Sequence, residues 1–280
     1  MKRFQAYQTQ KSCKRNQSFV EVSTLAVGGG GNLELIPKCF RRLFKNFVSG
    51  QAARLGFTLA EVLITLGIIG VVAAMTMPVL YANHQKKVIV TQLKKAYSIL
   101  QQAIVFSTQE NGSVDMWALN NISGLRLWED YFEKYIQYSE VGSMPTIIAK
   151  GNYTRLNGSG ANGDGMFSNY SNRYVKINGG MILIFSSGHV NSNNAYMGVD
   201  VNGLKRPNRL GKDVFYFVIS NKYGLQPYGG PGAPEWNAKK FNRDYMKNNG
   251  NGACNKNSFG NYCTALIMND GWEIKDDYPW

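Results

Sequence analysis

The chain has 280 residues and a formal net charge of +13. Its length fits one modest globular domain with additional segments. Its only two histidines, His84 and His189, are far apart, and the sequence contains no nucleophile motif and no clustered carboxylates, which argues against an enzyme.

The positive charge is concentrated at the start of the chain. Residues 1–56 hold ten basic and two acidic side chains, so +8 of the +13 lies there and +5 lies in the remainder. A mildly basic remainder does not call for a nucleic-acid partner. We interpret residues 1–56 as a basic leader that is removed on processing, in which residues 35–48 form a short amphipathic helix on the membrane surface.

Residues 57–80 form the most apolar segment, and their only charged side chain is Glu61. As a helix the segment would rise roughly 36 Å, which is enough to cross a hydrocarbon core about 30 Å thick. We therefore predict a transmembrane helix. Pro78, near its far end, is expected to cause a kink or local unwinding. The alternative is an ordinary signal-anchor helix with a chance glutamate near its end.

Glu61 needs an explanation because a carboxylate inside a bilayer is costly and usually has a partner. If the chain were cut before Phe57, the new amine would have a pKa of about 8 and would be mostly cationic at neutral pH. The two groups lie one helical turn apart and could neutralise each other within a chain or between two chains. In the alternative, Glu61 reaches the nearby interface and pairs with lipid or water.

The order of Gly56, Phe57, Glu61 and an unbroken apolar run resembles the processing site of type IV pilins and type II secretion pseudopilins. The resemblance covers residues 56–80. It implies that a prepilin peptidase cleaves between Gly56 and Phe57 and methylates the Phe57 amine. It also implies that Glu61 meets the terminal amine of a neighbouring subunit during filament assembly.

Residues 81–112 are predicted to continue as an amphipathic helix, with Asn111 and Gly112 as its C-cap. Its apolar positions recur at spacings of three and four: Val90, Leu93, Tyr97, Leu100, Ile104 and Val105. This stripe would pack on a globular head. A coiled-coil dimer is the alternative, but the heptad pattern is too short to favour it.

Residues 113–280 are predicted to form the head of an α+β, pilin-like fold. Residues 125–138 should be a second amphipathic helix, and the Gly- and Asn-rich residues 151–165 a flexible surface loop. An antiparallel sheet of about four strands should pack on the long helix. The expected strands are residues 173–177, 181–185, 195–201 and 214–220, with a hairpin turn at Asn178, Gly179 and Gly180.

The segment that starts Asp200-x-Asn202-Gly203 resembles one found in many pilin-like heads. Asp200, Asn202 and Asp213 could offer oxygens to a calcium ion, but their spacing is not that of an EF-hand. A structural turn is favoured over a metal site, and no other cofactor is expected.

Cys254 and Cys263 are predicted to form a local disulfide if the C-terminal side is exported. Half of a metal site is the alternative, although no further Cys or His lies nearby in the sequence. Cys13 and Cys39 belong to the leader and should take no part. A short helix is expected around residues 236–247, and the aromatic tail at residues 272–280 should dock on the head.

Basic residues flank both ends of the apolar span, and the leader favours a cytoplasmic N-terminus. We expect a single-pass inner-membrane protein with an exported head, located in the cell envelope or in a surface filament. The resemblance implies a structural subunit of a pilus or secretion pseudopilus, whose partners are the prepilin peptidase and other such subunits. The alternatives are a minor pilin whose head binds a ligand, for DNA uptake or adhesion, and a membrane-anchored exported protein that never assembles.

Overall fold

The computed structural model describes residues 57–144, 146–147, 152–161, 165–188, 192–231, 233 and 242–280. The chain divides into two compact units, Met1–Val72 and Ala73–Trp280. The predicted leader, its amphipathic helix and Gly56 all lie outside the described residues.

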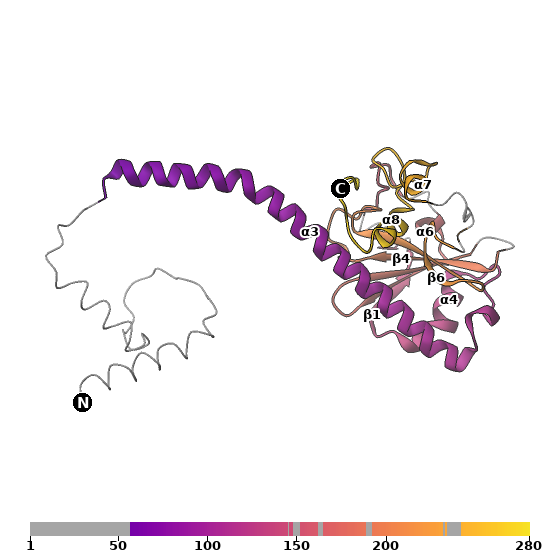
Figure 1. Cartoon of the computed structure of the whole chain (residues 1–280). Helices are drawn as coiled ribbons and strands as arrows, with labels where there is room; N and C mark the ends of the chain where they lie inside the picture. The colour runs from indigo at the N-terminus through magenta and orange to yellow at the C-terminus, as the bar shows by residue number, and fades with distance from the viewer. Residues whose placement is uncertain are drawn as a thin grey trace, which may run out of the picture. The chain divides into compact units, whose positions relative to one another are not determined.

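The helix α3 (Leu59–Asn111) is 53 residues long, and it contains both predicted helical segments (Figure 1). It ends where the sequence predicts, since Gly112 follows with a φ of 74°, the left-handed conformation of a helix C-cap. Pro78 lies inside α3 without interrupting it, so of the two predicted effects, a kink or local unwinding, the unwinding does not occur. A proline removes one backbone hydrogen bond, and the turns on either side keep theirs.

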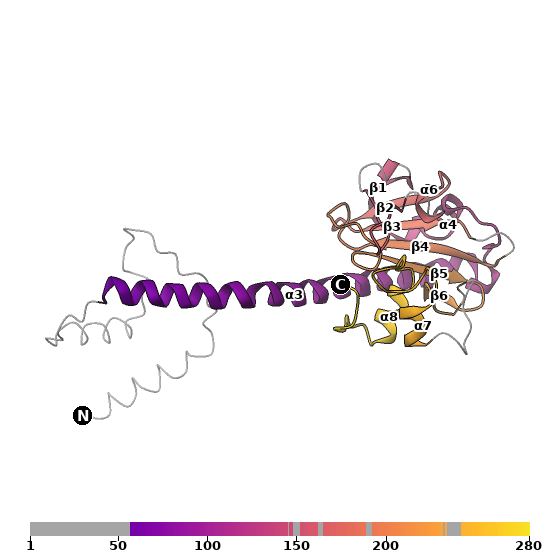
Figure 2. The same ribbon diagram turned by 90° about the horizontal axis from the view of Figure 1, so that it is seen from above.

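The C-terminal half of α3 buries one face against the sheet (Figure 2). Four of the six predicted apolar positions are buried, and Tyr97 is partly buried, but Val105 is 57% exposed. The buried face continues instead through small residues that a search for large apolar side chains overlooks. It consists of Val90, Leu93, Ala96, Leu100, Ala103, Ile104 and Ser107.

The sheet has six antiparallel strands in chain order, which confirms the α+β class and corrects the expected number of strands. The strands are β1 (Tyr138–Ser143), β2 (Arg173–Ile177), β3 (Ile182–Ser186), β4 (Asn194–Asp200), β5 (Val214–Ser220) and β6 (Gly224–Pro227). The four predicted strands are present within one residue, and Gly179 and Gly180 form the predicted turn with φ values of 100° and 88°. Strands β1 and β6 are not predicted from the sequence, because β1 is largely polar and β6 is short and ends in proline.

In β2–β6 both faces of the sheet are largely buried, with alternate residues pointing to opposite sides, whereas β1 is mostly exposed. Phe215, Phe217 and Ile219 of β5 belong to the main core, which also contains the buried face of α3. Val214 and Tyr216 belong to a second apolar cluster that contains no residue of α3. The sheet therefore has one face covered by the long helix and one face covered by short helical segments and loops.

Residues 125–138 do not form one helix, contrary to the prediction. The helix α4 (Gly124–Tyr131) starts with Ser123 as its N-cap, a 3₁₀ turn follows at Glu133–Tyr135, and the chain enters β1 at Tyr138. Pairing of β1 with β2 decides this boundary, because Tyr138 lies opposite Ile177. The local apolar pattern is compatible with a longer helix, and the tertiary pairing overrides it.

Residues 151–165, expected to form a flexible surface loop, also differ from the prediction. Among the described residues of this segment, Tyr153, Leu156 and Ala161 are buried, and the Thr154 N–H donates to the Asn208 carbonyl at 3.0 Å. Short helices complete the head, namely α6 (Gly165–Ser168), α7 (Arg243–Asn248) and α8 (Cys263–Asn269). The helix predicted around residues 236–247 corresponds in part to α7, and residues 234–241 lie outside the described part of the chain.

Candidate functional site

The start of α3 is fixed by reciprocal hydrogen bonds between Thr58 and Glu61. The Thr58 N–H donates to Glu61 Oε2 at 2.8 Å, and the Glu61 N–H donates to Thr58 Oγ1 at 3.2 Å. The Thr58 hydroxyl also donates to Glu61 Oε2 at 2.9 Å. This is a capping box, which satisfies two of the backbone donors that a helix start leaves open.

From its position in the sequence, Glu61 is expected only to pair with a terminal amine or with the membrane interface. The spacing Thr58-x-x-Glu61 is itself a capping signature, and it would have identified the second role from sequence. Phe57 precedes the capping box and is 85% exposed, whereas Gly56 lies outside the described residues. The structure therefore gives Glu61 a defined position at the start of the helix but does not test the predicted cleavage.

The apolar segment that follows Glu61 is left uncovered by the part of the chain that the structure describes. Its large side chains are all more than two-fifths exposed, and none of the most apolar window of α3 is buried inside the protein. By length and composition α3 can cross a membrane. Removing so much apolar surface from water is strongly favourable, at about 25 cal/mol per Å². The segment is therefore a candidate membrane anchor.

Asp200 is one of the two buried carboxyl groups at the predicted turn. It is fully buried, its Oδ2 accepts a hydrogen bond from the Tyr153 hydroxyl at 2.7 Å, and its Oδ1 accepts one from the Asn202 N–H at 3.3 Å. Burial raises the pKa of Asp200 well above its usual range, and the nearby charge of Asp213 raises it further. Tyr153 precedes Asp200 by 47 residues, and no local pattern in the sequence pairs them.

Asp213 closes the turn. Its carboxylate accepts the backbone N–H groups of Asn208 at 2.9 Å and Arg209 at 2.6 Å, and the Asn202 side-chain amide at 3.2 Å. Burial is the largest influence on its carboxyl group and raises the pKa of Asp213.

The structure thus brings Asp200, Asn202 and Asp213 together, as the calcium hypothesis requires. Tyr153, the backbone of the turn and the Asn202 amide donate hydrogen bonds to the two carboxylates, whereas the buried Oδ1 of Asn202 has no hydrogen-bond donor among the described residues. In the part of the chain that the structure describes, no group of three or more His, Cys, Asp or Glu side chains could hold a metal ion. The hydrogen bonds of Asp200 and Asp213 given above are those of a structural turn held against Tyr153.

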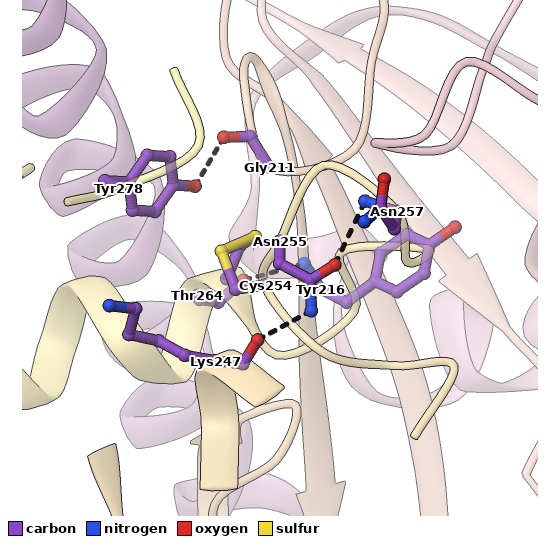
Figure 3. Close-up of a disulfide and its surroundings, with 9 residues drawn as sticks. Gly211, Tyr216, Lys247, Cys254, Asn255, Asn257, Thr264 and Tyr278 are labelled. Atoms are coloured by element: carbon purple, nitrogen blue, oxygen red, sulfur yellow. Dashed lines mark hydrogen bonds between the residues drawn. A yellow bond between two sulfur atoms is a disulfide. The ribbon is translucent and has the colours of Figure 1, made fainter. Parts of the chain in front are cut away.

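Cys254 and Cys263 are joined in a disulfide, with a Cα–Cα distance of 4.8 Å (Figure 3). Both cysteines are fully buried in the main core. Cys263 begins α8, and the next residue, Thr264, accepts the Tyr216 N–H of β5 at 3.0 Å. The disulfide therefore lies where α8 meets the sheet. The disulfide is thus well packed, although the sequence around its two cysteines is rich in Gly and Asn.

The aromatic tail docks on the head, as predicted. Tyr278 is buried and its hydroxyl donates to the Gly211 carbonyl, while Trp272 and Trp280 pack against the main core. Arg243 of α7 joins the tail to the end of α8 by hydrogen bonds to Asp277 and Asp270. Hydrogen bonds from Arg243 and Lys247 lower the pKa of Asp277.

Residues 79–280 match the model of a family of unknown function (DUF6613). This match covers more than half of the chain. The chain belongs to this family. Comparison with curated proteins and with solved structures gave no match. The family match starts directly after Pro78, so the shared region comprises the head and the whole C-terminal half of α3.

We predict that the disulfide contributes measurably to the stability of the head. The double variant Cys254→Ala/Cys263→Ala should lose about 2–4 kcal/mol of unfolding free energy, because the crosslink restricts the unfolded chain. Guanidinium denaturation of the full chain in detergent, followed by tryptophan fluorescence, measures this loss. The matched control is Cys13→Ala/Cys39→Ala, which should behave as wild type. Mass spectrometry of denatured, unreduced protein from an oxidising compartment should show the crosslink, and two free thiols would contradict it.

A second prediction concerns how the unfolding free energy depends on pH. The folded protein raises the pKa of Asp200, so it binds a proton more readily than the unfolded chain does. This contribution to stability is fully present below the unfolded pKa of about 4 and is lost as pH rises through the folded value. Asp200→Asn keeps an oxygen acceptor for Tyr153 and removes the titration. Its unfolding free energy should therefore fall less than that of wild type as the pH rises above the unfolded pKa of about 4.

The control for this experiment is Asp276→Asn, which removes an exposed carboxylate from the same domain. Denaturation curves at several pH values give the comparison. An identical pH dependence in Asp200→Asn and wild type would refute the assignment.

Proposed function

We propose that this chain is a structural subunit of a type IV pilus or of a type II secretion pseudopilus, processed by a prepilin peptidase and assembled through its N-terminal helix. The observation that carries the proposal is the uncovered apolar surface at the start of α3. This surface directly follows Gly56, Phe57 and a capped Glu61. An α+β head that packs the other half of α3 on an antiparallel sheet is consistent with it.

In this proposal the apolar segment is covered first by lipid and then by other subunits. Before assembly, lipid covers side chains such as Leu63 and Ile69, which are about three-fifths exposed. In a filament, the same surface would be covered by the equivalent helices of neighbouring subunits. Both environments are apolar, so transfer from one to the other does not expose these side chains to water.

Glu61 would then serve assembly as well as helix capping. Cleavage after Gly56 would leave a cationic amine at Phe57, and among helices surrounded by lipid a charge needs a partner. The capping box holds the Glu61 carboxylate at the helix start by way of Thr58. A carboxylate with a fixed position can meet the amine of the next subunit without first losing side-chain freedom. In this proposal the partners are the peptidase, the membrane and other subunits, and the exported head lies in the cell envelope or in a surface filament.

We expect processing between Gly56 and Phe57. In cells that contain a prepilin peptidase, mass spectrometry and N-terminal sequencing should find a mature chain that begins with N-methylated Phe57. Gly56→Leu should block cleavage, because a bulky residue replaces the smallest one at the scissile bond. Gly50→Leu is the matched control in the same leader and should be processed normally. A mature N-terminus at another residue would contradict the proposal.

Glu61→Gln tests the charge separately from the cap. Glutamine can replace glutamate in a capping box, so the helix start should be retained while the carboxylate charge is lost. Membrane insertion should be unchanged, and assembled filament should decrease at least about tenfold, because a charge-assisted contact is worth about 1.5–3 kcal/mol. Filament recovered by shearing is compared with membrane-bound subunit on immunoblots.

Thr58→Ala provides the complementary control. It removes the hydroxyl from the cap, keeps the Glu61 charge, and should assemble better than Glu61→Gln. Wild-type filament levels in Glu61→Gln would show that the charge has no part in assembly.

A further inference from the structure

The second face of the sheet, opposite α3, carries a pocket of about 390 Å³. This volume is within the range of small-molecule sites, about 300–1,000 Å³. Residues from β3, β4 and β5 and from the segments after β3 and β6 line it. The pocket lies within Ala73–Trp280, and neither the Asp200 turn nor the disulfide contributes to its lining.

Three tyrosines form the aromatic part of the pocket. The ring of Tyr228 lies 5.7 Å from that of Tyr196 and 6.3 Å from that of Tyr216, measured between centroids. The Tyr228 N–H donates to the Tyr216 carbonyl at 2.9 Å, which fixes the chain after β6 against β5. Tyr216 is buried, whereas Tyr196 and Tyr228 are half-buried. The pocket thus has aromatic surface that a ligand can reach.

The polar part of the pocket is held in place by a fully buried asparagine. Asn172 Oδ1 accepts both the N–H of Ser187 at 3.0 Å and its hydroxyl at 3.2 Å. The Asn172 amide in turn donates to the carbonyls of Gly165 and Met166 at 2.8 and 3.0 Å. Asn172 therefore fixes Ser187 and Gly165, two residues that line the pocket. Such fixed polar groups reduce the entropy that binding would cost.

Two further observations narrow the chemical class of ligand that this pocket could bind. None of the described residues that line the pocket is charged, although the chain as a whole is strongly basic. Asn261 also lines the pocket, and its buried Oδ1 has no hydrogen-bond donor among the described residues. An unpaired buried acceptor is costly, so a ligand hydroxyl that met Asn261 after a rotation of its side-chain amide would gain a hydrogen bond.

We propose that this pocket binds a neutral saccharide. The C–H groups of a sugar ring can stack on the electron-rich faces of Tyr196 and Tyr228. Its hydroxyls both donate and accept, which matches Ser187 and Asn169 and supplies a donor for Asn261. A proline-rich peptide also favours aromatic grooves, but its prolines offer only carbonyl acceptors and would leave Asn261 unpaired. This inference goes beyond the proposed filament function and does not depend on it.

The test uses the full chain in micelles of a zwitterionic detergent, because a detergent with a sugar head group would compete. Saturation-transfer NMR is recorded with the methyl glycosides of glucose, galactose and N-acetylglucosamine, and with maltose and cellobiose. We expect saturable transfer to the ring C–H protons of at least one of these sugars. A proline-rich peptide and N-acetylneuraminic acid are measured in the same way.

Gly165→Trp is the blocking variant. A Cβ at Gly165 meets no atom within 4 Å, so the larger side chain can be added at the pocket without a clash at its base. It should weaken sugar binding at least about tenfold by occupying the space. Gly160→Trp is the matched control, because Gly160 also has nothing within 4 Å and does not line the pocket.

A second pair of variants tests the aromatic contact. Tyr228→Ala should weaken binding to a similar extent, whereas Tyr170→Ala, at a tyrosine that is 76% exposed and outside the pocket, should not. Thermal melting of each variant verifies folding. The proposal is overturned if no sugar in the panel binds, if Gly165→Trp binds as wild type does, or if only the peptide or the charged sugar binds.

Discussion

The contact between the C-terminal half of α3 and the sheet is the interaction on which the rest of the head depends. Leu93 and Leu100 are fully buried in a core shared with Phe185 of β3 and Phe217 of β5. Tyr97 extends this contact, since its ring stacks on that of Phe217 at 5.8 Å and meets that of Trp272 at 5.5 Å. One face of the helix therefore organises both the sheet and the C-terminal tail.

Covering one face of the sheet with a long helix leaves the opposite face to short helical segments and loops. Its apolar strand residues, such as Ile184 and Val214, are covered in part by Tyr153 and Phe167, which come from segments outside the sheet. Loops have few apolar side chains, so this layer includes polar groups that must be paired within it. The hydrogen bond from Tyr153 to Asp200 and the contacts of Asn172 are examples. The uncharged pocket lies in the same layer, where aromatic and amide side chains meet.

The single helix α3 has two kinds of surface, which are covered in different ways. Its C-terminal half is amphipathic and is satisfied by its own head, whereas its N-terminal part is apolar on all sides and needs an apolar environment from outside the chain. The family match follows this division, because it contains the head and begins at residue 79. The features that support a filament role therefore lie in a part of the chain that the family match does not include.

Features set by a few neighbouring residues could be predicted from the sequence. The membrane-length apolar run, the helix end at Gly112 and the hairpin at Gly179 and Gly180 each follow from backbone preferences or hydrophobicity over a short window. The cysteine pair was found for a similar reason, because the two residues are only nine apart in the sequence. Within the candidate site, the sequence identified Glu61 and the residues of the Asp200 turn.

Only the tertiary structure decided features that depend on burial by distant segments. Residues 132–138 leave the helix because β1 pairs with β2, and Tyr153 is buried because it reaches Asp200 across 47 residues. The grouping of Tyr196, Tyr216 and Tyr228 has no local signature, since each occupies an ordinary strand or loop position in its own segment. The pKa of Asp200 rises for the same reason, because a carboxyl group loses its hydration only when the rest of the fold closes over it.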